Sequence, residues 1–395
     1  MIYIKPHTRD YTLAVTALFL GSFVTFADLY STQPLLPALS EQFHVAPAVA
    51  SLSLSLTTGA LAFFLLLTPA LSELIGRKLI MAGSLALTGI FSILAAFSPG
   101  FTELLLIRLL QGIFLAGFPS IAMGYINEAF HPDSSGRAMG IYISGTSIGG
   151  MSGRFVVGAL TDFFSWQAAL CVLGAISLFI SFLFWRILPE TQNLSPKIVS
   201  LKRLSTALFR NLKNPDLLYL YFIGFILMGV FMTLYNYVGY PLMAPPYNLS
   251  QTIVGFIFVV YLTGTFSSTW MGGLADRMSR TKVLGAGIVI MLTGTVITLS
   301  PILWVKLTGL AVFTFGFFGG HSVASSWVGK NAGDTNQALA SSLYLLFYYA
   351  GSSLVGSAGG LSWSHFGWMG VILNIDILLL IALILTIFVP VREKT

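Results

Sequence analysis

Apolar residues occur along this chain in long blocks that short polar segments separate. A helix crosses the hydrocarbon core of a bilayer in about 20 apolar residues, and the blocks predict twelve such helices. The shortest connectors are turn-like, as at Ser98-Pro99-Gly100 between the third and fourth helices. The predicted spans cover residues 13–38, 47–71, 79–98, 103–127, 138–160, 166–188, 216–241, 251–273, 281–300, 304–328, 338–361 and 367–390.

Composition supports this interpretation. The 395 residues are 56% hydrophobic and only 9% charged, whereas a soluble domain carries about 25% charged residues. A cytosolic enzyme and an intrinsically disordered chain are therefore excluded. The one cysteine, Cys171, makes no internal bridge, which excludes a disulfide scaffold. The long first span leads directly into further spans and is expected to be a retained anchor.

The basic residues predict the orientation of the chain. With the N-terminus inside, most of the 20 Lys and Arg side chains fall in cytoplasmic segments, as the positive-inside rule requires. Both termini are therefore expected in the cytoplasm. The same bias accounts for the net charge of +6, so no nucleic-acid partner is expected.

The polar segment 189–215 predicts a basic cytoplasmic linker between an N-terminal six-helix half, 1–188, and a C-terminal six-helix half, 216–395. The halves resemble each other, which favours a duplicated unit of the kind found in transporters. Matching features start at Pro69 and Gly272 (203 apart), at Gly145 and Gly351 (206 apart), and at Pro34 and Pro241 (207 apart).

These motifs resemble those of the major facilitator superfamily. The family's loop motif is Gly-x-Leu-Ala-Asp-Arg-x-Gly-Arg-Lys; the second copy keeps Gly272, Leu274, Ala275, Asp276, Arg277 and Arg280, and the first keeps Leu71, Gly76, Arg77 and Lys78. Arg108-x-x-Gln111-Gly112 is similar to a motif of drug–proton antiporters. The segments 142–154, 321–327 and 341–344 resemble the YnfM-type branch of bacterial exporters.

The resemblance implies an all-α membrane protein with twelve transmembrane helices in two pseudo-symmetric six-helix bundles. It implies a conformational latch at the loop motifs, with Glu128 as the partner of Arg77. The alternative is that these charges only satisfy the positive-inside rule. The latch residues are Glu73, Gly76, Arg77, Glu128, Gly272, Asp276, Arg277 and Arg280.

One motif departs from the family. The antiporter motif of span five reads Gly-x-x-x-Gly-Pro-x-x-Gly-Gly. Gly145, Gly149 and Gly153 stand here and, like Gly112, are expected to allow close helix packing. Gly150 replaces the proline and Arg154 replaces the last glycine. The departure weakens the inference of export from this motif.

Asp28 is the most informative single residue. A carboxylate deep in a membrane helix costs about 2.5–3.5 kcal/mol on insertion scales, so it needs a partner, a cavity or a proton. Asp28 is therefore a candidate for proton coupling or substrate contact, and the alternative is a structural hydrogen bond to a neighbouring helix. Arg108, which stays charged, is expected to hold a carboxylate or anion, and the alternative is snorkelling to the interface.

Five further residues are weaker candidates for proton coupling or substrate contact. Each has a structural alternative: snorkelling for the arginine, a hydrogen-bonded imidazole for the histidine, and an interhelix contact for the aspartate. These residues are Gln111, Arg154, Asn236, His321 and Asp376.

The sequence thus predicts a secondary transporter working by alternating access, with proton-coupled export of a small amphiphilic molecule or metabolite as the favoured activity. An importer or facilitator of a nutrient is the main alternative, and a non-transporting membrane sensor is a further one. No enzyme activity, cofactor or metal site is expected. The expected partners are a small-molecule substrate, protons and the lipid bilayer, for a monomer in the bacterial inner membrane.

Overall fold

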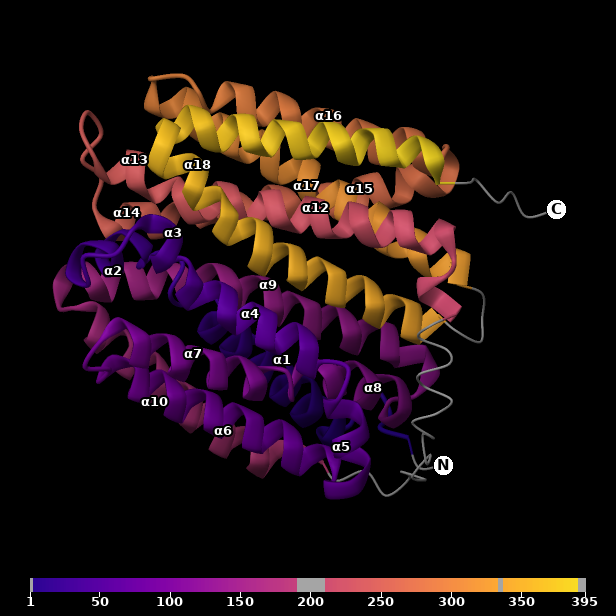
Figure 1. The fold of residues 1–395 in the computed structure, drawn as a ribbon. Helices are drawn as coiled ribbons and strands as arrows, with labels where there is room; N and C mark the ends of the chain where they lie inside the picture. The colour runs from indigo at the N-terminus through magenta and orange to yellow at the C-terminus, as the bar shows by residue number, and fades with distance from the viewer. Residues whose placement is uncertain (1–2, 190–209, 333–336, 390–395) are drawn as a thin grey trace. The chain divides into compact units, whose positions relative to one another are not determined.

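The computed structural model describes residues 3–189, 210–332 and 337–389, and almost all of these are helical (Figure 1). The predicted linker, 189–215, falls mostly outside the described residues. The described chain divides into two compact units. Unit 1 consists of residues 3–38, 56–189 and 250–256, and unit 2 consists of 39–55, 210–249, 257–332 and 337–389. The predicted division into 1–188 and 216–395 follows chain order and stays a prediction.

The described residues up to 189 form ten helices. Several predicted spans are built from two shorter helices, because a proline interrupts them: Pro34 follows α1, and Pro119 starts α8. The helices are α1 (Arg9–Leu29), α2 (Leu36–Gln42), α3 (Pro47–Ala50), α4 (Leu52–Phe64), α5 (Thr68–Ile75), α6 (Arg77–Ala96), α7 (Phe101–Leu115), α8 (Pro119–Ala129), α9 (Pro132–Phe163) and α10 (Trp166–Ile187).

The described residues from 210 onward form seven α-helices and one 3₁₀ segment. The 3₁₀ segment lies inside span eight, between α14 and α15. The elements are α12 (Pro215–Tyr237), α13 (Gly239–Met243), α14 (Gln251–Phe256), η1 (Ile257–Val260), α15 (Tyr261–Arg277), α16 (Arg280–Ile297), α17 (Leu303–Ala332) and α18 (Gln337–Phe388).

Ten stretches among the described residues are long and apolar enough to cross a membrane. Two features account for the difference from the predicted twelve. Helix α9 is 32 residues long but rich in glycine, serine and charge, so it falls below the hydropathy limit. Helix α18 contains spans eleven and twelve joined at Gly367, whose φ of +59° interrupts the helix. The predicted fold class is confirmed.

The surface of the helices is apolar, as contact with lipid requires. Large hydrophobic side chains are exposed throughout, among them Leu74 (85%), Trp304 (76%) and Ile387 (72%). Conversely, Asp28, Arg108 and several serines and threonines are buried. These polar groups of the spans therefore lie inside the protein.

Glycines bring two helix pairs into close contact, and the same contact occurs once in each unit. A Cβ atom added at these glycines would overlap the facing helix, α1 in the case of α9 and α12 in the case of α18. Small residues allow such approach in membrane proteins. The contacting pairs are Phe19 with Gly145 and Ala27 with Gly153 in unit 1, and, 206 residues later, Phe225 with Gly351 and Thr233 with Gly359 in unit 2.

Candidate functional site

Asp28 lies in unit 1 near the end of α1, where the close packing of α1 on α9 ends. Its carboxylate is buried and accepts hydrogen bonds from two serine hydroxyls, one from Ser92 on α6 and one, at 2.5 Å, from Ser177 on α10. Both partners are neutral and can rotate. A hydroxyl can donate to a carboxylate or accept from a carboxylic acid, so this site can hold Asp28 in either protonation state.

Arg108 is buried beside this carboxyl group and interacts with it electrostatically. Its guanidinium donates to the main-chain carbonyl oxygens of Asp28 (3.2 Å) and Leu29 (3.0 Å). These carbonyls belong to the last turn of α1, beyond which the helix does not continue to offer them N–H groups four residues on. The Asp28 oxygen also accepts from the Ser31 N–H at 3.3 Å and from its hydroxyl at 2.9 Å. Arg108 therefore caps a helix that ends inside the protein, as well as placing a positive charge near Asp28.

Gln111 connects the two charged residues. Its Oε1 accepts from Arg108 at 2.5 Å, and its Nε2 donates to Ser92 Oγ at 2.8 Å and to the carbonyl oxygen of Thr88 at 3.0 Å. A chain of hydrogen bonds therefore runs from Arg108 through Gln111 and Ser92 to Asp28. The structure thus joins three predicted site residues.

Gly112, the next residue of α7, has a packing role. The helix approaches α4 there, and an added Cβ would lie 2.9 Å from Thr57 Cα. The glycine therefore allows the close helix contact that the sequence predicts for it.

Arg154 is also buried in unit 1. Its guanidinium lies over the ring of Tyr30, 4.1 Å from the centroid, and its Nε donates to Gln33 Oε1 at 2.6 Å. A further hydrogen bond of 2.5 Å reaches the carbonyl oxygen of Gly150. This residue does not snorkel; it holds the turn that follows α1, which contains Tyr30 and Gln33.

The predicted residues of unit 2 lie in different surroundings. Asn236 is buried on α12 and its Nδ2 donates to the carbonyl oxygen of Gly356 on α18 at 3.4 Å. His321 on α17 forms a 2.9 Å hydrogen bond with the Tyr344 hydroxyl and stacks on Phe317. Asp376 accepts from Thr295 Oγ1 at 2.6 Å, a contact that joins α18 to α16.

The first loop motif surrounds the turn between α5 and α6. Gly76 occupies this turn with φ +106°, a conformation that favours glycine. Arg77 forms an ion pair with Glu128 at 2.7 Å. Glu73 lies on α5, but its side chain is outside the described residues. The pair joins the start of α6 to the end of α8.

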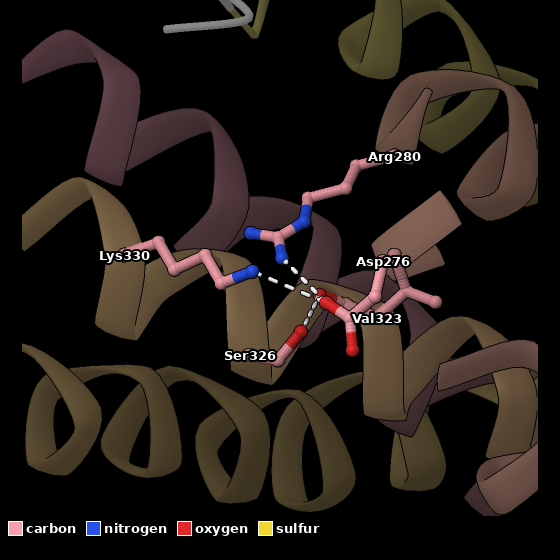
Figure 2. Close-up of polar contacts among 5 residues, drawn as sticks. All are labelled: Asp276, Arg280, Val323, Ser326 and Lys330. Carbon is pink, nitrogen blue, oxygen red and sulfur yellow. Dashed lines mark hydrogen bonds and ion pairs between the residues drawn. The ribbon is translucent and has the colours of Figure 1, made fainter. Parts of the chain in front are cut away.

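The second loop motif forms a charged cluster within unit 2 (Figure 2). The Asp276 carboxylate on α15 accepts from Arg280 at the start of α16 (3.2 Å) and from Lys330 on α17 (3.1 Å). Ser326 Oγ, beside the cluster, donates to the Val323 carbonyl oxygen at 3.0 Å.

Two other predicted latch residues occupy α15. A Cβ atom added at Gly272 would lie 3.4 Å from Ser322 Oγ of α17. Arg277 is exposed in the last turn of α15. The motif therefore holds three helix ends together.

Three functional partners were missed by sequence reasoning. Ser92 and Ser177 contact Asp28, but nothing distinguishes them in sequence from the other serines of the spans. Lys330 stands out in the sequence only as a cytoplasmic charge, although it pairs with Asp276. Among the described residues, no group of three His, Cys, Asp or Glu side chains forms a possible metal site.

Comparison with known proteins places these features in a family. The sequence profile of the Major Facilitator Superfamily matches residues 18–240 and 234–395. The "Uncharacterized MFS-type transporter YybF" of Bacillus subtilis is 46% identical over 383 residues, covering 97% of this chain and 95% of that protein. The "Inner membrane transport protein YnfM" of Escherichia coli is 42% identical over 382 residues, covering 97% of this chain and 91% of that protein.

Solved structures share the fold. A bacterial homologue of the human lysosomal transporter Spinster, in an inward-facing and unoccupied conformation, superposes with a TM-score of 0.83 at 16% identity, over 97% of both chains. A structure of the nucleoside transporter NupG superposes with a TM-score of 0.74 at 17% identity, over 95% of this chain and 99% of that one. Sequence and fold together show that this chain belongs to the major facilitator superfamily.

Proposed function

We propose that this transporter is a proton-coupled exporter of a small amphiphilic molecule, with Asp28 as the group that gains and loses the proton. The observation that carries the proposal is the surroundings of the Asp28 carboxylate. It is buried in a membrane helix, where a charge is costly, yet its two direct partners, Ser92 and Ser177, are neutral hydroxyls. A purely structural carboxylate needs no such adaptable partners.

Arg108 supports the same role. Its guanidinium stays charged and is fixed by the carbonyl oxygens of α1 and by Gln111. A fixed positive charge near Asp28 favours loss of the proton. Gain of a proton at Asp28 removes its negative charge and with it the attraction to Arg108. Substrate binding can be coupled to this change in charge.

An amphiphilic substrate is favoured by the side chains of the second half. Phe231 on α12 packs among other aromatic rings of unit 2, and its centroid lies 3.8 Å from that of Phe317. Near this cluster, Tyr235 and Thr314 share a hydrogen bond of 2.5 Å. The Phe231 and Phe317 rings and the hydroxyl pair are buried in unit 2, and a ligand that entered between them would meet largely apolar groups.

The loop motifs are assigned the role of latches. The ion pairs of Arg77 with Glu128 and of Asp276 with Arg280 and Lys330 each join helix ends within one unit, and in this proposal they break when the protein changes conformation. With the positive-inside orientation, both motifs and both termini lie on the cytoplasmic side of the inner membrane.

The test is growth of an efflux-deficient bacterial strain on a panel of toxic lipophilic cations, dyes and metabolite analogues. Cells expressing the wild type, Asp28→Asn or Asp376→Asn are compared at equal membrane expression. Asp376 is the matched control, since it is a span carboxylate whose contact, to Thr295, lies in the other unit. The proposal expects protection by the wild type and Asp376→Asn, and its loss in Asp28→Asn.

Two outcomes contradict the proposal. Protection that persists in Asp28→Asn removes the proton role of this residue. Greater sensitivity in cells that express the wild type indicates import of the compound, the main alternative, which the loss of the span-five proline at Gly150 keeps open.

A further inference from the structure

The end of span five holds the beginning of span eight through a carboxylate that none of the motifs described above includes. Asp162, in the last turn of α9, lies two residues beyond the predicted span 138–160. One carboxylate oxygen accepts from the Gln251 N–H at 3.1 Å. The other accepts from the N–H and the hydroxyl of Thr252, both at 2.6 Å. The carboxylate thus binds the first N–H groups of α14, which have no partner within their own helix.

This contact extends along two turns of α9. Gln251 is buried, and its side-chain amide donates to the carbonyl oxygen of Pro34. Gly158 allows the backbone of Gln251 to approach, since an added Cβ would lie 2.7 Å from its carbonyl oxygen. The rings of Phe155 and Phe256 meet edge to face at 5.7 Å. Helix α14 is therefore docked on α9 by charge, by backbone contact and by an aromatic pair.

The chain changes its hydrogen-bonding pattern immediately after this docked helix. Residues Ile257–Val260 form the 3₁₀ segment η1, and α15 begins at Tyr261. A stretch of 3₁₀ helix within a span is a frequent position for a hinge. The docked residues 250–256 belong to unit 1, whereas the chain from Ile257 onward belongs to unit 2. Span eight thus contains a first part docked on α9, a 3₁₀ segment and a second part.

The duplicated half lacks this carboxylate cap. A shift of 206 residues relates Thr252 to Ala46, the residue before α3, and Ala46 makes no side-chain capping hydrogen bond. The same shift relates Asp162 to Trp368. The cap is therefore not a requirement of the fold, and its presence in one copy points to a specific role.

The groups around Asp162 favour the charged form of its carboxyl group. Burial raises the pKa of this carboxyl, but hydrogen bonds from Thr252, Ser250 and Gln251 outweigh it and hold the pKa below its usual value. A cap by an ionised carboxylate is also favoured by the positive end of the helix dipole.

We propose that Asp162 is a releasable latch that holds the first turn of span eight on span five, and that transport requires its release. The proposal rests on membership of a family that works by alternating access, not on export or on proton coupling. Asp162 lies in the last turn of α9, whereas the loop-motif ion pair Arg77–Glu128 joins α6 to α8, so the two contacts are separate.

The test measures docking directly and needs no substrate. The full chain carries Cys171→Ser, so that Phe155→Cys and Phe256→Cys are its only thiols. The rate of cross-linking by a short bifunctional maleimide is compared in membranes for Asp162, Asp162→Asn and Asp162→Ala. Loss of hydrogen bonds to a charged acceptor predicts a rate lower by about tenfold in Asp162→Ala. Asp162→Asn, which keeps one acceptor oxygen, is expected to lie between.

Glu103→Gln is the matched control, because Glu103 is an acidic residue of the first turn of α7 whose carboxylate lies near Gly100. It is expected to cross-link like the parent. Equal cross-linking in the parent and in both Asp162 variants would overturn the proposal, as would absence of cross-linking in the parent. If Asp162→Ala does not reach the membrane, Asp162→Asn decides by itself, since it preserves the shape of the side chain.

Discussion

Arg108 and Asp28 are predicted to depend on each other for stability. Arg108→Gln leaves the Asp28 carboxylate buried without its neighbouring cation, and breaking a buried charge pair in this way costs about 3–5 kcal/mol. It also removes two hydrogen bonds to the last carbonyls of α1. Hydrogen bonds between membrane helices contribute about 0.6 kcal/mol each, so these two account for only about 1 kcal/mol. Most of the loss is therefore electrostatic.

The electrostatic part can be recovered by a second substitution. Asp28→Asn in the Arg108→Gln background removes the uncompensated charge and leaves an amide that still hydrogen-bonds to Ser92 and Ser177. The double variant is expected to regain about 2–4 kcal/mol, the difference between the charge penalty and the hydrogen-bond loss. Only the loss of the helix cap then remains.

The assay is unfolding of the purified protein in mixed micelles, followed by tryptophan fluorescence, for the wild type, the two single variants and the double variant. Arg108→Gln with Asp376→Asn is the control, since it neutralises a carboxylate in the other unit and is expected to restore nothing. A double variant that is no more stable than Arg108→Gln refutes the electrostatic coupling. The cap of α1 is then the main contribution of Arg108.

Three further predictions use the same unfolding assay. Gly149→Val is expected to lower the free energy of unfolding by about 1–3 kcal/mol by overpacking against α1. Gly140→Val, on the same helix with open space around it, is expected to leave it unchanged. Equal effects of the two substitutions would contradict the close contact. Gly76→Ala is expected to cost about 1–3 kcal/mol because of its φ of +106°, and an unchanged midpoint excludes strain there. Glu128→Gln is expected to cost under about 1 kcal/mol, since its ion pair is half exposed, and a larger loss indicates a structural rather than a latch role.

The spans were predictable because a membrane imposes a simple requirement on sequence. Every crossing helix must be apolar over a fixed length, and that pattern survives the breaks after Leu29 and at Pro119. Asp28 and Arg108 were identifiable for the same reason, as charges where charges are costly. This requirement, together with the repeated motifs, explains why the fold could be predicted from the sequence.

Apart from the pair Arg77–Glu128, which the family resemblance implied, the partners were not predictable, because they depend on tertiary packing. Asp28 meets Ser92 and Ser177, which are 64 and 149 residues away along the chain. Asp162 has Arg154 as its nearest charged neighbour in span five, whereas its partner Thr252 is 90 residues later. The role of Arg108 as a helix cap required knowing that α1 ends at Leu29.

The glycine contacts that recur after 206 residues bear on how this protein diverged. The same backbone docking occurs twice, at Gly145 and at Gly351. The buried pair Asp28 and Arg108 has no charged counterpart at the equivalent positions: a shift of 206 relates Asp28 to Leu234, and Arg108 to Thr314, whose partner is a tyrosine hydroxyl. The two copies therefore share these helix contacts but not the buried charge pair. The double substitution Leu234→Asp with Thr314→Arg would test whether the second copy accepts the same charge pair. The pseudo-symmetry thus identifies positions at which the protein can be redesigned.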